Sequence, residues 1–187
     1  QLPLPGHINE HAILEAINPD KDVDGFNPWN VGKLMSGYKE FAPATPSGIM
    51  TILDRLDVNL AGMDAVVVGR SNIVGKPMSL LLLERGVTVT TCHSRTADLK
   101  RYTKDADLVR VAAGVPNLIT ADMVKKCVII IDVGINRLDD GSLVGDVDFE
   151  ACKEKASLIT PVPGGVGPMT IATLLENLVK DFKKQGS

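Results

Sequence analysis

Apolar residues recur with two different periods along the chain, and the change of period divides it into regions. Near the start only short amphipathic segments occur, and helices are predicted over residues 10–17 and 30–38, separated by a polar turn that contains Pro and Gly. A longer helix is expected from Thr45, which can cap it, with Pro46 at its first position. The apolar face of that helix is expected to contain Ile49, Ile52, Leu53 and Leu56.

From residue 64 onward, short runs of β-branched residues alternate with helical segments. Strands are predicted at residues 65–68, 87–91, 108–112, 128–132 and 158–160. Helices are predicted at residues 75–85, 97–102 and 148–155, with a short strand or hairpin at 141–144. This alternation is typical of a parallel sheet covered by helices on both faces. The predicted fold class is therefore α/β, with a Rossmann-like parallel sheet flanked by helices.

The connection before the last helix has an unusually restricted backbone. The segment ITPVPGGVGPMT, residues 159–170, contains three prolines and three glycines. Proline fixes φ, and glycine allows close approaches that a Cβ would block, so this loop could lie stiffly against a flat ligand. The alternative is a plain connection before a helix at 169–184. The apolar stripe of that helix is expected to contain Ile171, Leu174, Leu175, Leu178 and Phe182.

Composition narrows the class of protein. The 187 residues carry a net charge of −3 and are 44% hydrophobic, which describes a globular protein with a real core. The acidic balance and the 4% aromatic content argue against nucleic-acid binding, and no apolar run is long enough to cross a membrane. Three unpaired cysteines indicate a reducing compartment, so we expect a cytoplasmic protein. The chain opens on Gln1, as expected for part of a longer protein.

A nucleotide site is indicated where the first strand of the sheet ends. The strand runs into Gly69, and the next helix opens near Gly75, so main-chain N–H groups at the helix start can face a phosphate. The glycines stand six positions apart, which departs from the usual G-x-G-x-x-G pattern. The glycine pattern alone is therefore a weak signal, and the next strand has to identify the cofactor.

The end of the second strand discriminates between NAD and NADP. NAD-binding units place Asp or Glu there to hold the ribose 2′-hydroxyl. Here the sequence is Cys92-His93-Ser94-Arg95, without an acid, and Arg70 follows the first strand. Two guanidinium groups and a hydroxyl suit a 2′-phosphate, so NADP is the predicted cofactor. The alternative is that both arginines are solvated loop charges, and His93 is given no role beyond proximity.

Eight segments occur in an order that resembles the methylenetetrahydrofolate dehydrogenase/cyclohydrolase family. They are QLPLP from residue 1, DVDGF from 22, ATPSG from 44, GRSNIVGKP from 69, CHSRT from 92, IDVGIN from 131, VGDV from 144 and PVPGGVGPMT from 161. The resemblance implies NADP-dependent oxidation of 5,10-methylenetetrahydrofolate, followed by hydrolysis of the methenyl product to 10-formyltetrahydrofolate. It also implies tetrahydrofolate derivatives as ligands, no metal, and a homodimer.

The resemblance also implies a division of the chain. Residues 1–45 would be the remnant of a second α/β, folate-binding domain, and residues 46–163 the NADP-binding domain. Residues 164–187 would be a loop and a helix that packs back toward the folate domain.

The resemblance assigns roles to individual residues. Asp24 would hold the pterin, whose N–H donors suit a carboxylate, although a D-G turn residue is the alternative and Asp22 is expected to be structural. Gln1 would assist the catalytic lysine. Three loop residues would border folate and nicotinamide: Pro163, Gly164 and Gly165. The implied cofactor-binding residues are Gly69, Arg70, Ser71, Val74, Gly75, His93, Ser94, Arg95, Gly134 and Ile135.

Two departures from the family pattern stand out. The catalytic Tyr and Lys of the family lie upstream of QLPLP, so this chain alone is expected to lack cyclohydrolase activity. Arg110 is a charge inside an otherwise apolar strand, and an edge or strand-end position is expected for it. A non-catalytic NADP-binding remnant remains the alternative function. A third possibility is an amino-acid or shikimate-type dehydrogenase, which shares the nucleotide-binding half. Such an enzyme would lack the pair formed by Asp24 and PGGVGP, so the sequence disfavours this class.

Overall fold

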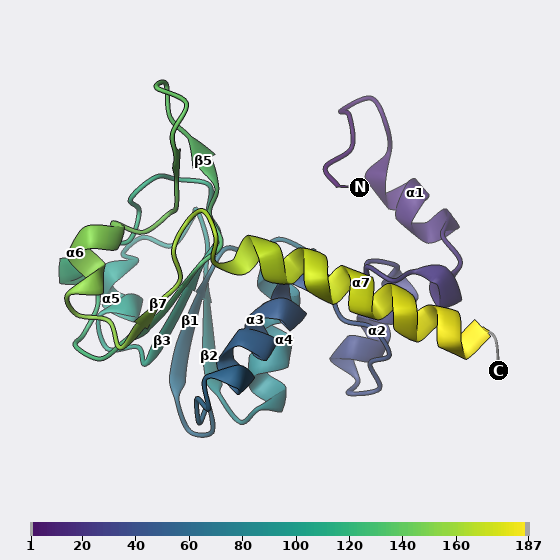
Figure 1. Cartoon of the computed structure of the whole chain (residues 1–187), viewed down its shortest axis with the longest axis horizontal. Helices are drawn as coiled ribbons and strands as arrows, with labels where there is room; N and C mark the ends of the chain where they lie inside the picture. Colours follow the sequence, from purple (N-terminus) through teal and green to yellow (C-terminus); the bar gives the residue numbers. More distant parts are fainter. Residues whose placement is uncertain (1, 186–187) are drawn as a thin grey trace.

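The structure is a computed structural model that describes residues 2–185, so Gln1 lies outside the described residues. Figure 1 shows a sheet with helices around it on the left and a long helix that runs from it to the right. In the part of the chain that the structure describes, no helix is long and apolar enough to cross a membrane.

Five parallel strands form the main sheet, in the order β2-β1-β3-β4-β7. They are β1 (Asp64–Val68), β2 (Thr88–Cys92), β3 (Leu108–Val111), β4 (Ile129–Asp132) and β7 (Leu158–Ile159). Each observed boundary lies within one residue of the predicted one. The prediction of a parallel sheet is confirmed.

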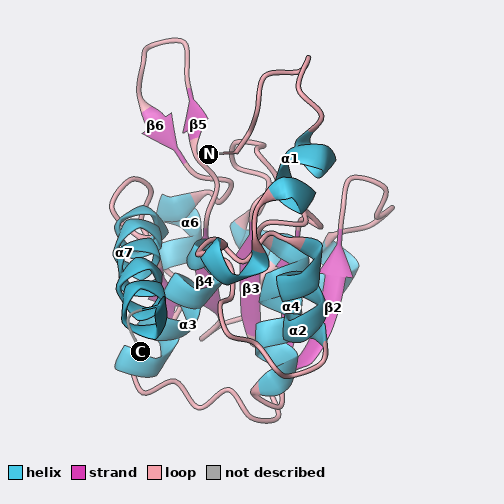
Figure 2. Cartoon of the chain, turned by 90° about the vertical axis from the view of Figure 1, so that its right-hand side faces the viewer, coloured by secondary structure: helices cyan, strands magenta, loops and turns pink. Residues whose placement is uncertain are grey.

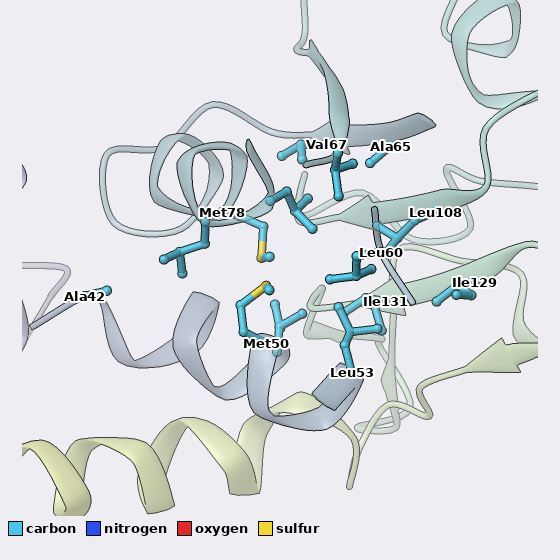
Figure 3. Close-up of a cluster of buried hydrophobic side chains, with 14 of the residues drawn as sticks. Ala42, Met50, Leu53, Leu60, Ala65, Val67, Met78, Leu108, Ile129 and Ile131 are labelled. Carbon is cyan, nitrogen blue, oxygen red and sulfur yellow. The ribbon is translucent and has the colours of Figure 1, made fainter. Parts of the chain in front are cut away.

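Two apolar clusters bury the two faces of this sheet, as expected for a parallel sheet. One cluster packs helices α3 (Ala44–Arg55) and α4 (Gly75–Glu84) against the strands, and within it Met50 and Met78 point toward one another (Figure 3). The opposite face is covered by α5 (Lys100–Thr103), η2 (Ala121–Met123) and α6 (Phe149–Lys153). Figure 2 shows α3 and α4 together on one side of the strands.

Helix α3 differs from its prediction at both its cap and its buried face. It begins at Ala44, with Pro43 before it and no side-chain hydrogen bond at the cap, so Thr45 is a helical residue and not the cap. Met50 is buried, whereas Leu56 lies just beyond the helix and is 54% exposed. The helix ends at Arg55, one residue before Leu56.

Three short helical elements precede the sheet: α1 (Glu10–Ala16), η1 (Pro19–Lys21) and α2 (Pro28–Met35). Each begins after an asparagine whose side chain accepts a main-chain N–H. Helix α2 begins two residues before its predicted start, with Pro28 as its first residue, where the missing N–H costs nothing.

The antiparallel pair β5 (Asn136–Arg137) and β6 (Leu143–Val144) projects from the sheet (Figure 2). The segment 141–144 was therefore correctly expected to be part of a hairpin, but its partner strand was not predicted. Two residues in each strand are too few for a periodic pattern.

Helix α7 (Val166–Gln185) buries the opposite face from the one predicted. Beyond Val166 at its start, its buried positions are Thr173, Asn177 and Asp181, four residues apart. The expected apolar stripe is largely exposed, with Phe182 at 78%. Asn177 donates from Nδ2 to the main-chain oxygens of Val23 (3.0 Å) and Ala42 (3.5 Å), and this polar packing fixes how α7 is rotated.

Candidate functional site

The turn between β1 and α4 depends on two glycines that allow the backbone to approach itself closely. Gly69 has φ +113°, and a Cβ there would lie 2.3 Å from the Ala112 oxygen. A Cβ on Gly75 would lie 2.2 Å from the Gly69 oxygen. Any larger residue would push the start of α4 away from the end of β1, so both glycines are required by geometry.

The main-chain donors of this turn are arranged differently from the expectation. The first N–H groups of α4 are already used, because Ser71 accepts from Gly75 through Oγ (3.2 Å) and from Lys76 through its carbonyl (3.0 Å). Within the described residues, no acceptor is found for the main-chain N–H groups of Ser71, Asn72 and Ile73. The donors available to an anion thus lie in the turn before the helix rather than in the helix itself.

The end of β2 forms a tight turn beside the glycines. His93 donates its main-chain N–H to Thr96 Oγ1 (2.9 Å), and Arg95 donates its main-chain N–H to His93 Nδ1 (3.1 Å). His93 Nδ1 is therefore an acceptor, and the imidazole is oriented by the turn.

A cleft of about 400 Å³ connects the ends of β1, β2 and β3. It brings together four of the predicted residues: Gly69, Arg70, His93 and Ser94. Three others, Ser71, Val74 and Arg95, belong to the adjoining turns and do not line this cleft. Arg70 and Arg95 are both exposed, but only Arg70 lines the cleft, so Arg70 is the better placed cation.

A second cleft of about 580 Å³ lies between the end of β4 and the loop before α7. Its lining includes Gly134, Ile135, Pro163, Gly164 and Gly165, all of them predicted site residues. Thr45 and Thr170, whose hydroxyls are 3.1 Å apart, join its wall from the starts of α3 and α7. Most of the remaining wall is apolar, which suits a flat ring more than a charged group.

The loop holds its shape through its glycines. Gly164 has φ +97°, a region that L side chains rarely adopt. A Cβ on Gly165 would lie 2.4 Å from the Pro161 oxygen. In contrast, Gly167 has open space around it and no positive φ. The restriction therefore resides in Gly164 and Gly165, beside Pro163.

Two buried carboxylates shape the ends of the strands, and neither was predicted as a site residue. Asp146 accepts main-chain N–H groups from Ala113, Gly114 and Val115 and the Asn136 amide. Asp132 accepts main-chain N–H groups from Gly134, Asp146 and Val147, although burial raises its pKa. Their only sequence signal was their place in the IDVGIN and VGDV segments.

Gly134, in the IDVGIN segment, is required by a close contact. A Cβ on Gly134 would lie 2.3 Å from the Asp146 carboxyl. The glycine therefore lets the wall of the second cleft pack directly on a buried acid.

Asp24 lines neither cleft. It is partly buried, and both burial and the neighbouring Asp22 carboxylate raise the pKa of Asp24. Asp22 accepts from the Asn27 main-chain N–H (2.8 Å) and from Asn30 Nδ2 (2.9 Å), which confirms that it is structural. In the described chain no hydrogen bond fixes the Asp24 carboxylate, so it remains able to accept hydrogen bonds from a ligand.

Arg110 contradicts its predicted position. It lies in β3, the central strand, beside Val67 of β1 and Ile131 of β4, and its exposed fraction is 0%. Its Nε, Nη1 and Nη2 atoms all lack a hydrogen-bond partner. Burial lowers its pKa to about 10, a cost on the order of 3 kcal/mol for keeping it charged at neutral pH.

No group of three or more His, Cys, Asp or Glu side chains within residues 2–185 is placed to hold a metal ion. Cys92, Cys127 and Cys152 are all free thiols.

Comparison with known proteins identifies the family. Residues 43–186 match the profile of the tetrahydrofolate dehydrogenase/cyclohydrolase NAD(P)-binding domain. The bifunctional protein FolD of Bacillus licheniformis is 59% identical over 98% of this chain and 65% of its own length. FolD of Campylobacter fetus is 62% identical over 99% of this chain and 65% of its own length. The chain thus spans about 65% of the length of these relatives.

Solved structures agree with the sequence comparison. FolD methylenetetrahydrofolate dehydrogenase/cyclohydrolase from Campylobacter jejuni superposes with a TM-score of 0.97 at 58% identity, covering 99% of this chain and 66% of that one. The Trypanosoma brucei methylenetetrahydrofolate dehydrogenase-cyclohydrolase, complexed with NADP and an inhibitor, gives 0.94 at 40% identity, covering 99% and 66%. Sequence and fold together show that this chain belongs to the tetrahydrofolate dehydrogenase/cyclohydrolase family and contains its NAD(P)-binding domain.

Proposed function

We propose that this chain carries the cofactor site of an NADP-dependent 5,10-methylenetetrahydrofolate dehydrogenase. The observation that carries the proposal is the open turn from Gly69 to Gly75 beside a β2 end with Ser94 and no carboxylate. A carboxylate there would hold the ribose 2′-hydroxyl of NAD, whereas Arg70 and Ser94 suit a 2′-phosphate. The Trypanosoma brucei relative, solved with NADP, supports the same cofactor.

The second cleft is the proposed meeting place of nicotinamide and folate. Bound NADP would supply the hydride acceptor, and the methylene carbon of the substrate is activated as a donor by the two nitrogens beside it. This chain contributes a wall, Pro161–Pro168, whose restricted backbone can hold two flat rings near contact distance. The mostly apolar lining also keeps water away from the reacting carbon.

The folate end of the site is proposed to include Asp24. Its unengaged carboxylate offers acceptors only, which matches the adjacent N–H donors of a pterin edge. We propose Gln1 as the assistant of a catalytic lysine in the cyclohydrolase step. The Tyr and Lys motif of the family does not occur in residues 1–187, so cyclohydrolysis is proposed only for a protein that also carries that motif.

A homodimer in the cytoplasm is the proposed state of the whole protein. The exposed side chain of Leu138 on the projecting hairpin is consistent with an intersubunit contact. The net charge of −3 and the few aromatic residues favour small-molecule ligands over nucleic acid.

The proposal is tested in two steps. Calorimetric titration of this chain with NADP and with NAD should give a lower Kd for NADP. Reduction of NADP by 5,10-methylenetetrahydrofolate should then be followed by absorbance in the protein at its native length. Tight NADP binding without any reduction would favour the alternative, a non-catalytic NADP-binding protein.

Asp24→Asn is the matching test of the folate end. In the native-length protein it should weaken folate binding and leave NADP binding unchanged, because Asn presents one acceptor and an unwanted donor to the pterin. Asp139→Asn, an exposed change on the hairpin, serves as the control. An unchanged folate affinity would return Asp24 to the role of a turn residue.

A further inference from the structure

The guanidinium of Arg110 is a complete set of buried donors without an acceptor. Its three nitrogens are buried and unpartnered, and the whole residue is inaccessible to solvent. Buried charges in proteins are normally paired or bound to an ion, because removing a charge from water is costly. A charge retained in the central strand of the sheet therefore calls for an anion outside the protein itself.

The neighbouring acids do not supply that anion. The negative charges of Asp146 and Asp132 raise the pKa of Arg110, but neither carboxylate forms an ion pair or a hydrogen bond with it. Both carboxylates are occupied by main-chain N–H groups. Asp132 also follows Ile131 on β4 and therefore points to the other face of the sheet from Arg110.

The guanidinium instead lies under the turn between β1 and α4. A Cβ built on Gly69 would be 3.7 Å from Arg110 Nη1, so only the glycine separates this nitrogen from the turn. Above Gly69, the main-chain N–H groups of Ser71, Asn72 and Ile73 have no acceptor in the described chain. The ten-residue helix α4 begins next to this turn, and the helix dipole gives its N-terminus a partial positive charge.

We propose that Arg110 is a buried positioning charge for the diphosphate group of the cofactor, acting on it through the Gly69 turn. The inference rests on the proposed NADP site and adds to it a residue from the opposite side of the turn. The diphosphate would complete a site whose positive charge and free donors are otherwise uncompensated. The buried charge of Arg110 thus destabilises the free protein, and the negative charge of the diphosphate compensates it in the bound protein.

The test compares stability and binding in Arg110→Met, which keeps the length of the side chain and removes its charge. The free Arg110→Met protein should melt several degrees higher than the wild type, because an unpaired buried charge is gone. Its Kd for NADP should rise about tenfold, since a charge in a poorly polarisable interior is weakly screened. Arg110→Lys should recover part of the affinity.

Two comparisons separate this role from others. Adenosine 2′-monophosphate, which lacks the diphosphate, should bind wild type and Arg110→Met equally, whereas inorganic diphosphate should bind the variant more weakly. Arg55→Met is the control, since Arg55 is exposed at the last turn of α3 and should change neither melting nor binding.

The outcomes distinguish this inference from the proposed function. If the wild type binds NADP and Arg110→Met binds it with the same Kd, the role of Arg110 is overturned and the proposed cofactor site is retained. A lower melting temperature, or loss of folded Arg110→Met protein, would also overturn it, because Arg110 would then stabilise the free core. Absence of NADP and diphosphate binding in the wild type would refute both.

Discussion

Asn177 donates a hydrogen bond from its side chain to the main-chain oxygen of Val23, 3.0 Å away and 154 positions earlier in the sequence. This bond, with a second one to Ala42, joins the C-terminal helix to the segment that precedes the sheet. It explains why α7 turns a polar row inward and leaves apolar side chains outside. The exposed stripe around Phe182 is consequently a surface available to other parts of a longer protein.

Asn177→Ala should lower the free energy of unfolding by about 1–3 kcal/mol, because two buried carbonyls lose their donor. Urea denaturation measures the change. Glu176→Ala, at the neighbouring exposed position, should cost less than about 0.5 kcal/mol. Equal losses for the two variants would show that the buried hydrogen bonds of Asn177 do not determine the effect, since Ala has the higher helix propensity at both positions.

Arg70→Ala should weaken NADP binding by about 1–3 kcal/mol and NAD binding much less, because the lost contact is a charge-assisted one to the 2′-phosphate. Ser94 and Arg95 are expected to contribute in the same direction. Isothermal titration with both cofactors measures the difference, with Arg55→Ala as an exposed control. If both cofactors lose the same affinity, Arg70 does not recognise the 2′-phosphate.

Gly165→Ala should abolish hydride transfer in the native-length protein while leaving a folded chain that binds NADP at its phosphate end. The added Cβ would meet the Pro161 oxygen at 2.4 Å, so the loop must shift at the second cleft. Gly167→Ala is the matched control, because its Cβ would have open space. Normal turnover of Gly165→Ala with unchanged melting would reduce the loop to a connection.

Asp107→Asn should change the pH dependence of stability. The hydrogen bond from Lys125 Nζ, followed by that from the Asp64 main-chain N–H, lowers the pKa of Asp107. A lowered carboxyl pKa stabilises the fold above the unfolded value of 3.8, and this contribution disappears as the pH falls through the folded value. The wild type should therefore exceed the variant in stability at pH 7, and the two should converge in strong acid.

The Asp107 effect should stay below about 1 kcal/mol, since both partners are about one-third exposed and screened by solvent. Urea unfolding at several pH values provides the measurement. Asp105→Asn is the control, because its carboxylate is well exposed and lies 3.8 Å from Lys104 Nζ. A difference between wild type and Asp107→Asn that persists at the lowest pH would exclude the ionic explanation.

Local chemistry made much of this protein predictable. The five strands were visible as apolar β-branched runs, because a parallel strand buried on both faces needs such residues along its length. The turn from Gly69 to Gly75 was also visible, since glycine is the residue that tolerates a backbone approach this close. The order of short segments identified the family, and the parallel sheet follows from the same local patterns.

The tertiary structure alone decided the features that depend on what lies opposite a residue. The apolar period of α7 was detected correctly, but a helical period defines a face and not its partner, and the carbonyls of Val23 and Ala42 selected the polar face instead. Likewise, the sequence places Arg110 in a strand, whereas the strand order puts that strand at the centre of the sheet. Both outcomes arise from contacts between residues far apart in the chain, which no local pattern encodes.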